Sequence, residues 1–243
     1  MRRILKFISS LLLLTLLSSM LPAQETGMRL RGPRIGVDLA GLVLLYTEPE
    51  RSIYTFSVDY EAWQDIYPVL EFGFQNVELN RETYNYISSG IFGRFGVDIN
   101  LLKYEQTNVY EMFYTGFRYG ISYLTHQADD IYLADPYFGD VTGAAVNENQ
   151  LNVHWISLVG GVKVEVFDNF FMGWSVLANI KLLQVKDENM TPYNIPGFGP
   201  GDKSTNVLFN YTLSYRFLPR EYKPKKILKK KPIPEQVDIP TQN

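Results

Sequence analysis

Apolar and polar side chains alternate with a period of two along most of the chain, and the segment Thr205–Phe217 is the clearest case. This period places successive side chains on opposite faces of a β-strand. One face of the segment is apolar and carries Val207, Phe209, Tyr211, Leu213, Tyr215 and Phe217. Soluble strands usually have about five or six residues, whereas a tilted strand that crosses a bilayer needs about 9–11. The length of the segment therefore favours a transmembrane strand.

Seven further segments alternate in a similar way, so the sequence predicts eight strands. These segments are Arg34–Tyr46, Ser52–Glu61, Tyr67–Val77, Ile91–Asn100, Val109–Tyr123, Val153–Val166 and Phe170–Leu182. The connections expected in the periplasm are short, and two of those on the outer side, 125–152 and 183–204, are long. Short turns on one side and long loops on the other are typical of outer-membrane barrels. We therefore expect an all-β fold, an eight-stranded antiparallel up-and-down transmembrane β-barrel over residues 34–217, with both termini in the periplasm.

The polar face of the predicted strands carries both signs of charge. Its charged residues are Arg34, Asp38, Asp59, Glu61, Glu71, Arg94, Asp98, Arg118, Lys163, Glu165, Lys181 and Arg216. In a soluble lipocalin-like barrel, the alternative reading, this face would point outward and the aromatic side chains would fill the lumen. An eight-stranded lumen barely accommodates ordinary side chains, so we expect the apolar face outward. The charged residues would then form a buried ion-pair network that plugs the lumen; a gated ion or proton path is the other interpretation.

The start of the chain differs in composition from the predicted barrel. Residues 1–23 combine a basic start with an apolar run, which predicts a cleaved signal peptide. Residues 24–33 are expected to be a periplasmic N-terminal segment. The sequence has no cysteine, which excludes disulfides, thiolate metal sites and a lipidated cysteine. Residues 24–219 contain 13 Lys and Arg against 23 Asp and Glu, and this acidic balance disfavours nucleic acid as a partner.

Residues 218–243 form a basic, proline-containing tail that we expect to be disordered in the periplasm. Its candidate docking residues are Lys225, Lys226, Ile227, Leu228, Lys229, Lys230 and Lys231. Positive charge would also suit anionic lipid headgroups or an acidic cell-wall polymer, and a tail that only increases solubility is a further reading. The apolar pair Ile227-Leu228 favours docking onto an envelope protein, since charge alone would not require it.

Little in the sequence points to catalysis, and we expect no cofactor and no metal. His126 and His154 flank the first long loop, near Ser122 and Ser157. A His–Ser pair at a barrel rim would suit an enzyme that acts on lipid A. Four acids in the same loop lack the regular spacing of Ca²⁺ ligands, which favours a solvated acidic loop. These acids are Asp129, Asp130, Asp135 and Asp140.

Several stretches resemble an uncharacterised family of small outer-membrane barrels found in Bacteroidetes-type bacteria. They are Leu151-Asn152-Val153-His154-Trp155 running into residues 160–166, Tyr193-Asn194-Ile195-Pro196-Gly197-Phe198 followed by residues 209–215, and the shorter pieces 116–120 and 36–39. The resemblance covers most of residues 30–220. It implies an outer-membrane barrel and assigns no activity, catalytic residue or ligand.

These observations leave three hypotheses for the function. The first is a non-catalytic barrel, surrounded by outer-membrane lipid, that serves as a scaffold or accessory subunit of an assembly or export complex, with the basic tail docking a periplasmic partner. The second is a surface adhesion or ligand-binding barrel that acts through loops 125–152 and 183–204. The third is a lipid A-modifying enzyme at the barrel rim. The charged lumen and the lack of a catalytic motif favour the first.

Overall fold

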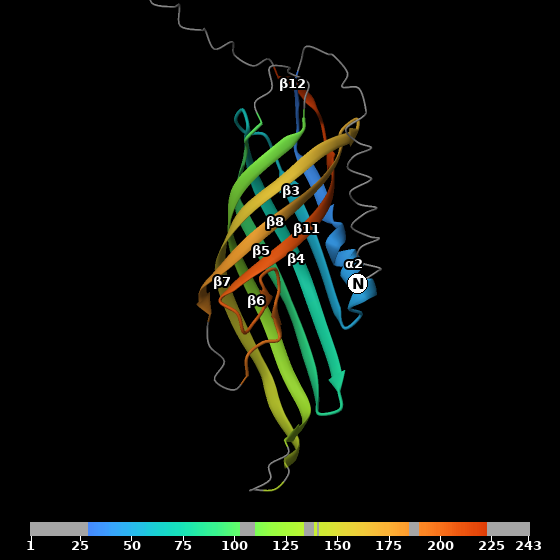
Figure 1. Ribbon diagram of the computed structural model, residues 1–243, viewed down its shortest axis with the longest axis vertical. Helices are drawn as coiled ribbons and strands as arrows, with labels where there is room; N and C mark the ends of the chain where they lie inside the picture. Colours follow the sequence, from blue (N-terminus) through green and yellow to red (C-terminus); the bar gives the residue numbers. More distant parts are fainter. Residues whose placement is uncertain (1–28, 103–109, 134–138, 140, 185–189, 223–243) are drawn as a thin grey trace, which may run out of the picture.

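Eight antiparallel strands close into a barrel in the computed structural model (Figure 1). The structure describes residues 29–102, 110–133, 139, 141–184 and 190–222. The barrel strands are β2 (Arg34–Asp38), β3 (Arg51–Asp59), β4 (Ile66–Arg81), β5 (Tyr84–Asn100), β6 (Met112–Leu133), β7 (Val141–Phe167), β8 (Phe170–Gln184) and β11 (Thr205–Arg216). Each pairs with the next, and β11 pairs with β2 to close the sheet. The predicted fold class, with its eight strands, is confirmed. We call the end at which β2 begins and β11 ends the terminal end, and the opposite end the distal end.

The apolar side chains point out of the barrel, as predicted. On β5, Ile91 and Phe95 are 61% and 57% exposed, whereas Arg94 is 2% exposed. On β7, Leu158 is 58% exposed and its neighbour Ser157 is fully buried. An apolar outer wall is the surface that lipid chains solvate in a transmembrane barrel. The soluble lipocalin-like reading, which requires a polar outer wall, is therefore wrong.

The strands β4 to β7 extend beyond the other strands at the distal end and form a projection, seen in the lower part of Figure 1. The polarity of the wall reverses there: on β4, Val77 is buried and Glu78 is exposed. A polar outside with an apolar inside is the pattern of a barrel wall in water. The predicted loop 125–152 is therefore wrong in extent, because β6 continues to Leu133 and β7 begins at Val141.

The helix α2 (Leu39–Thr47) follows directly on the short strand β2 and lies against the barrel wall between β3 and β11 (Figure 1). The prediction of one strand over Arg34–Tyr46 is therefore wrong from residue 39 onward. The Asp38 side chain accepts a hydrogen bond from the backbone N–H of Ala40 and caps the helix. The helical segment is apolar at nearly every position, so it lacks the alternation that specifies a strand. Within the described residues, no helix is long and apolar enough to cross a membrane.

The chain between β8 and β11 turns back into the lumen. We call residues 190–204 the plug loop; it contains the short strands β9 (Asn194–Ile195) and β10 (Gly199–Pro200), which pair with each other. Residues 194–199 are all buried. The prediction of an outer loop over 183–204 is wrong for this stretch, because its apolar side chains lose more contact with water inside the barrel than they could on the surface.

The two ends of the described chain pair with each other at the terminal end. β1 (Arg29–Arg31) and β12 (Arg220–Tyr222) form an antiparallel two-stranded sheet, which lies at the top of Figure 1. The sequence predicts a disordered tail from residue 218. Residues 220–222 instead form a strand, because the N-terminal segment supplies a strand partner.

Candidate functional site

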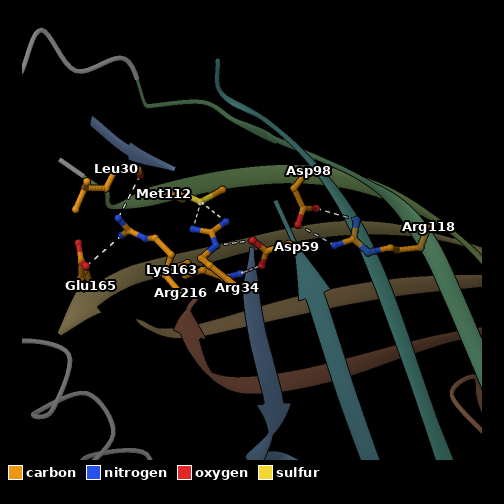
Figure 2. A network of polar contacts seen from close by, with 9 residues as sticks. All are labelled: Leu30, Arg34, Asp59, Asp98, Met112, Arg118, Lys163, Glu165 and Arg216. Atoms are coloured by element: carbon orange, nitrogen blue, oxygen red, sulfur yellow. Dashed lines mark hydrogen bonds and ion pairs between the residues drawn. The ribbon is translucent and has the colours of Figure 1, made fainter. Parts of the chain in front are cut away.

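The lumen contains a first layer of buried charges nearest β2. The Asp59 carboxylate on β3 contacts both Arg34 on β2 and Lys163 on β7, with Lys163 Nζ 2.6 Å from Asp59 Oδ2 (Figure 2). The terminal nitrogens of Arg34 lie 3.3 and 3.4 Å from the Met112 sulfur. Its guanidinium also lies over the Tyr67 ring, 4.7 Å from the centroid. One acid in this layer therefore serves two bases.

A second layer lies on β4, β5 and β6. Arg94 Nε is 2.7 Å from a Glu71 carboxylate oxygen, and these two residues are partners in the β4–β5 register. Arg118 reaches Asp98 at 2.8 Å and Glu71 at 3.5 Å. All four side chains are buried and belong to adjacent strands, so inward alternation together with the register of β4, β5 and β6 brings them together. Two acids and two bases make this layer neutral. Breaking a buried pair by removing one partner is strongly destabilising, because the other charge stays buried.

A third group of charges closes the terminal end. Arg216 on β11 donates to the Glu165 carboxylate at 3.1 Å and to the Leu30 carbonyl oxygen at 3.2 Å (Figure 2). Arg31 forms an ion pair with Glu61 at 3.2 Å. Arg31 was missed because it precedes the alternating segments. No signal in the sequence places it at the barrel mouth, since that position depends on the pairing of β1 with β12.

Two residues expected in the ion-pair network, Asp38 and Lys181, form hydrogen bonds with backbone groups instead. Asp38 accepts hydrogen bonds from the backbone N–H of Ala40, in the first turn of α2, and from that of Tyr211, which faces the place where β2 has ended. Lys181 lies nearer the distal end and donates to the Gly201 carbonyl oxygen at 2.7 Å and to Gln184 Oε1 at 2.8 Å. It therefore anchors the plug loop. The assignment of Asp38 and Lys181 to an ion-pair network is corrected.

The distal half of the lumen contains an apolar cluster, which sequence reasoning missed. Its cluster consists of Phe92, Leu124, Leu151, Val153, Trp155, Ile195 and Phe198. The Phe198 ring packs edge-on against Trp155, 5.9 Å between centroids, and Asn179 donates to the Phe198 carbonyl oxygen at 3.1 Å. Gly120 lies beneath the Trp155 indole, where any Cβ would overlap the ring. The sequence did place Trp155 among the inward-facing residues of β7. The direction of a side chain does not show which other groups fill the lumen around it.

The residues considered for catalysis separate in the structure. His126 is buried in the lumen near Tyr86, whereas His154 pairs with Tyr119 through a 2.7 Å contact on the outward face. The Ser122 hydroxyl donates to a backbone carbonyl, and the Ser157 hydroxyl donates to an asparagine side chain. Neither serine donates to a histidine, so the described geometry lacks the Ser–His pair that acyl transfer uses.

Residues 4–223 match the protein family described as Domain of unknown function (DUF6048). The chain belongs to this family. No curated protein matches it in sequence. Among solved structures, it is similar to CarO2 of Acinetobacter baumannii, with 8% identity, a TM-score of 0.40, and coverage of 79% of this chain and 100% of that chain. It is also similar to the N-terminal β-barrel domain of OprF from Pseudomonas aeruginosa, with 12% identity, a TM-score of 0.30, and coverage of 78% and 99%.

Other predicted sites in this DUF6048 chain lie partly beyond the described residues. The signal peptide (1–23), the docking residues 225–231, Asp135 and Asp140 are outside the description. Asp130 accepts a hydrogen bond from Asn85 at 3.0 Å. Across the described part of the chain, no group of three His, Asp or Glu residues is arranged to hold a metal ion. What the described lumen offers is a set of paired charges capped by an apolar plug.

Proposed function

We propose that this protein is a non-catalytic barrel of the bacterial outer membrane that serves as a scaffold or accessory subunit of an assembly or export complex, with its basic tail docking a periplasmic partner. The observation that carries the proposal is the filled lumen. Layers of ion pairs occupy its terminal half, and the apolar cluster with the plug loop occupies its distal half. Such a barrel presents its outer wall, its projection and its tail to other molecules.

The terminal sheet supports a role for the tail. β12 includes Tyr222, and its pairing with β1 holds this part of the chain at the terminal end of the barrel. Residues 220–243 contain seven Lys and Arg against three Asp and Glu. A basic tail that starts from a fixed point on the terminal end is suited to an acidic partner surface in the periplasm, because complementary charge speeds encounter and orients docking.

Affinity purification from outer membranes in mild detergent tests this proposal. We would compare the full-length chain with one that ends after Tyr222, which keeps β12 and its partner strand. A third chain carries Ile227→Ser and Leu228→Ser and retains every charge. Partners recovered with the full-length chain and lost with both variants would support tail docking. Equal recovery with all three chains would refute it, and recovery of no partner would refute the scaffold role itself.

The projection supports a second candidate, binding at the cell surface. β6 and β7 continue well past β8 and β11, and the wall there has a polar outside. Residues 194–199 of the plug loop are buried, so a surface function would use mainly the hairpin of β6 and β7. Deleting the hairpin beyond the paired residues Ala128 and Val146 keeps the register of the strands that remain. Unchanged cell adhesion and ligand capture by that variant would exclude this candidate.

A further inference from the structure

The distal half of the barrel wall has a seam between β3 and β11. β2 separates these strands only as far as Asp38, which pairs with Thr212 of β11. β3 continues to Arg51 and β11 begins at Thr205, so both run past the end of β2 without a strand between them. Neighbouring strands lie about 4.8 Å apart, so the gap left by one missing strand is about 10 Å wide. Helix α2, whose diameter is about 10 Å, occupies this seam.

The strand edges that face the seam carry backbone polar groups. The Ile53 carbonyl oxygen points at α2, because a Cβ built on Gly41 would overlap it. On the other side, the Tyr211 N–H points into the seam and reaches the Asp38 carboxylate at 2.9 Å. In an antiparallel strand every second residue directs its N–H and C=O to the same side, so Thr55 and Phe209 also present theirs to the seam.

Helix α2 does not satisfy these edges. Among the described residues, no backbone hydrogen bond joins α2 to β3 or β11. Leu42 and Val43 are 48% and 38% exposed on its outer side, which places the seam in contact with lipid. Open sheet edges are strongly disfavoured in hydrocarbon, because no water replaces the missing hydrogen bonds. The arrangement with α2 in the seam is therefore costly at the two edges.

We propose that residues 39–42 switch between the helix seen here and a continuation of β2 that seals the wall. This inference rests on the bilayer location proposed above and is independent of the scaffold role. A strand of another protein would also fit the seam. The chain's own segment has the advantage, because it is tethered at Asp38 in the correct register and its effective concentration exceeds that of any separate partner.

The existing register specifies the sealed state. Val37 pairs with Phe56 of β3, and Asp38 pairs with Thr212 of β11. Continuing both ladders gives each of residues 39–42 one partner on β3 and one on β11. The partners are Tyr54 and Tyr211 for Leu39, Ile53 and Asn210 for Ala40, Ser52 and Phe209 for Gly41, and Arg51 and Leu208 for Leu42. Ile35 and Val37 are exposed and Gly36 is buried, so alternation would turn Leu39 and Gly41 outward and Ala40 and Leu42 into the lumen.

The switch would change the wall between the bilayer and the apolar cluster around the plug loop. Ile53, on the edge of the seam, packs against the apolar cluster that includes Ile195 and Phe198. In the helix state α2 packs beside Ile53 at the seam without strand hydrogen bonds. In the sealed state a hydrogen-bonded strand takes its place. The two states therefore differ in how firmly the wall beside the cluster is closed.

A spin label at position 42 distinguishes the states, because Leu42 faces lipid in the helix and the lumen in the strand. The chain has no cysteine, so Leu42→Cys gives a single labelled site in the full chain reconstituted in phospholipid vesicles. Gly41→Val is the perturbation: its side chain overlaps Ile53 in the helix state and points outward in the strand state. Gly160→Val is the matched control, because no atom lies within 4 Å of a Cβ at Gly160. A label at Leu158→Cys, on the outer wall, reports bilayer insertion.

We expect two spectral components at position 42, one accessible to oxygen in the bilayer and one immobilised and shielded. Gly41→Val should cause a loss of the accessible component, and Gly160→Val should leave both unchanged. A single component that Gly41→Val does not alter would overturn the switch. Shielding found only in native membranes would overturn it as well, since another chain would then fill the seam. A label at 158 that oxygen does not reach would refute the bilayer location instead.

Discussion

Replacing Asp59 with asparagine tests how strongly the lumen charges hold the barrel together. The Asp59 carboxylate is the shared partner of Arg34 and Lys163, and all three side chains are at most 9% exposed. Asparagine keeps the size of the side chain but leaves two buried cations without a carboxylate. Removing one partner of a buried ion pair costs about 3–5 kcal/mol. We therefore expect Asp59→Asn to lower the free energy of unfolding by at least about 3 kcal/mol.

Lys163→Met provides the contrasting change. It removes the second cation of the layer, keeps the Arg34–Asp59 pair, and leaves no buried charge without a partner, so its cost should be smaller than that of Asp59→Asn. Glu50→Gln is the control: Glu50 pairs with Arg81 on the surface, where such pairs contribute about 0–1 kcal/mol. Urea unfolding in lipid vesicles, followed by tryptophan fluorescence, measures all three. A loss for Asp59→Asn no larger than that for Glu50→Gln would refute the reasoning, as would a larger loss for Lys163→Met.

Three further predictions concern the packing of the lumen. Phe198→Ala removes the main apolar contact of the plug loop and should cost about 3–5 kcal/mol of unfolding free energy in the same urea assay; a loss below about 1 kcal/mol would mean that the loop is not held there. Gly120→Val overlaps the buried indole and should lower the urea midpoint, whereas Gly160→Val, in open space, should not; equal midpoints would contradict this packing. A cysteine at buried Ile195 should stay unlabelled by a membrane-impermeant maleimide on intact cells, while one at exposed Thr191 reacts; equal labelling would show that the plug loop lies outside.

Part of the lumen could be predicted because strand geometry is local. Alternation assigns Arg34, Asp59, Glu71, Arg94 and the other inward charges to one face of their strands, and closure of an eight-stranded sheet leaves little space between them. It could not assign partners. The pairing of the charges depends on the stagger of one strand against the next and on contacts across the lumen. The sequence of a single strand contains neither kind of information.

The failures have a common physical cause. Alternation shows which face of a strand is apolar. It does not predict the structure of a segment in which both faces are apolar or in which the polarity of the faces reverses. Residues 39–47 are apolar at nearly every position, so only the cap at Asp38 and contact with β3 and β11 select a helix there. On the β4–β7 projection, the inside and the outside of the wall exchange polarity. The plug loop has no period at all.

The sequence by itself determined the eight strands, the outward apolar face and the collection of charges inside, because these follow from residue-by-residue alternation and from the length of each segment. Tertiary structure alone decided the pairing of charges, the folding of residues 194–199 into the lumen, the joining of β1 with β12 and the seam filled by α2. Each of these brings together segments that are distant along the chain. The free energy gained by burying them depends on neighbours that a local pattern does not contain.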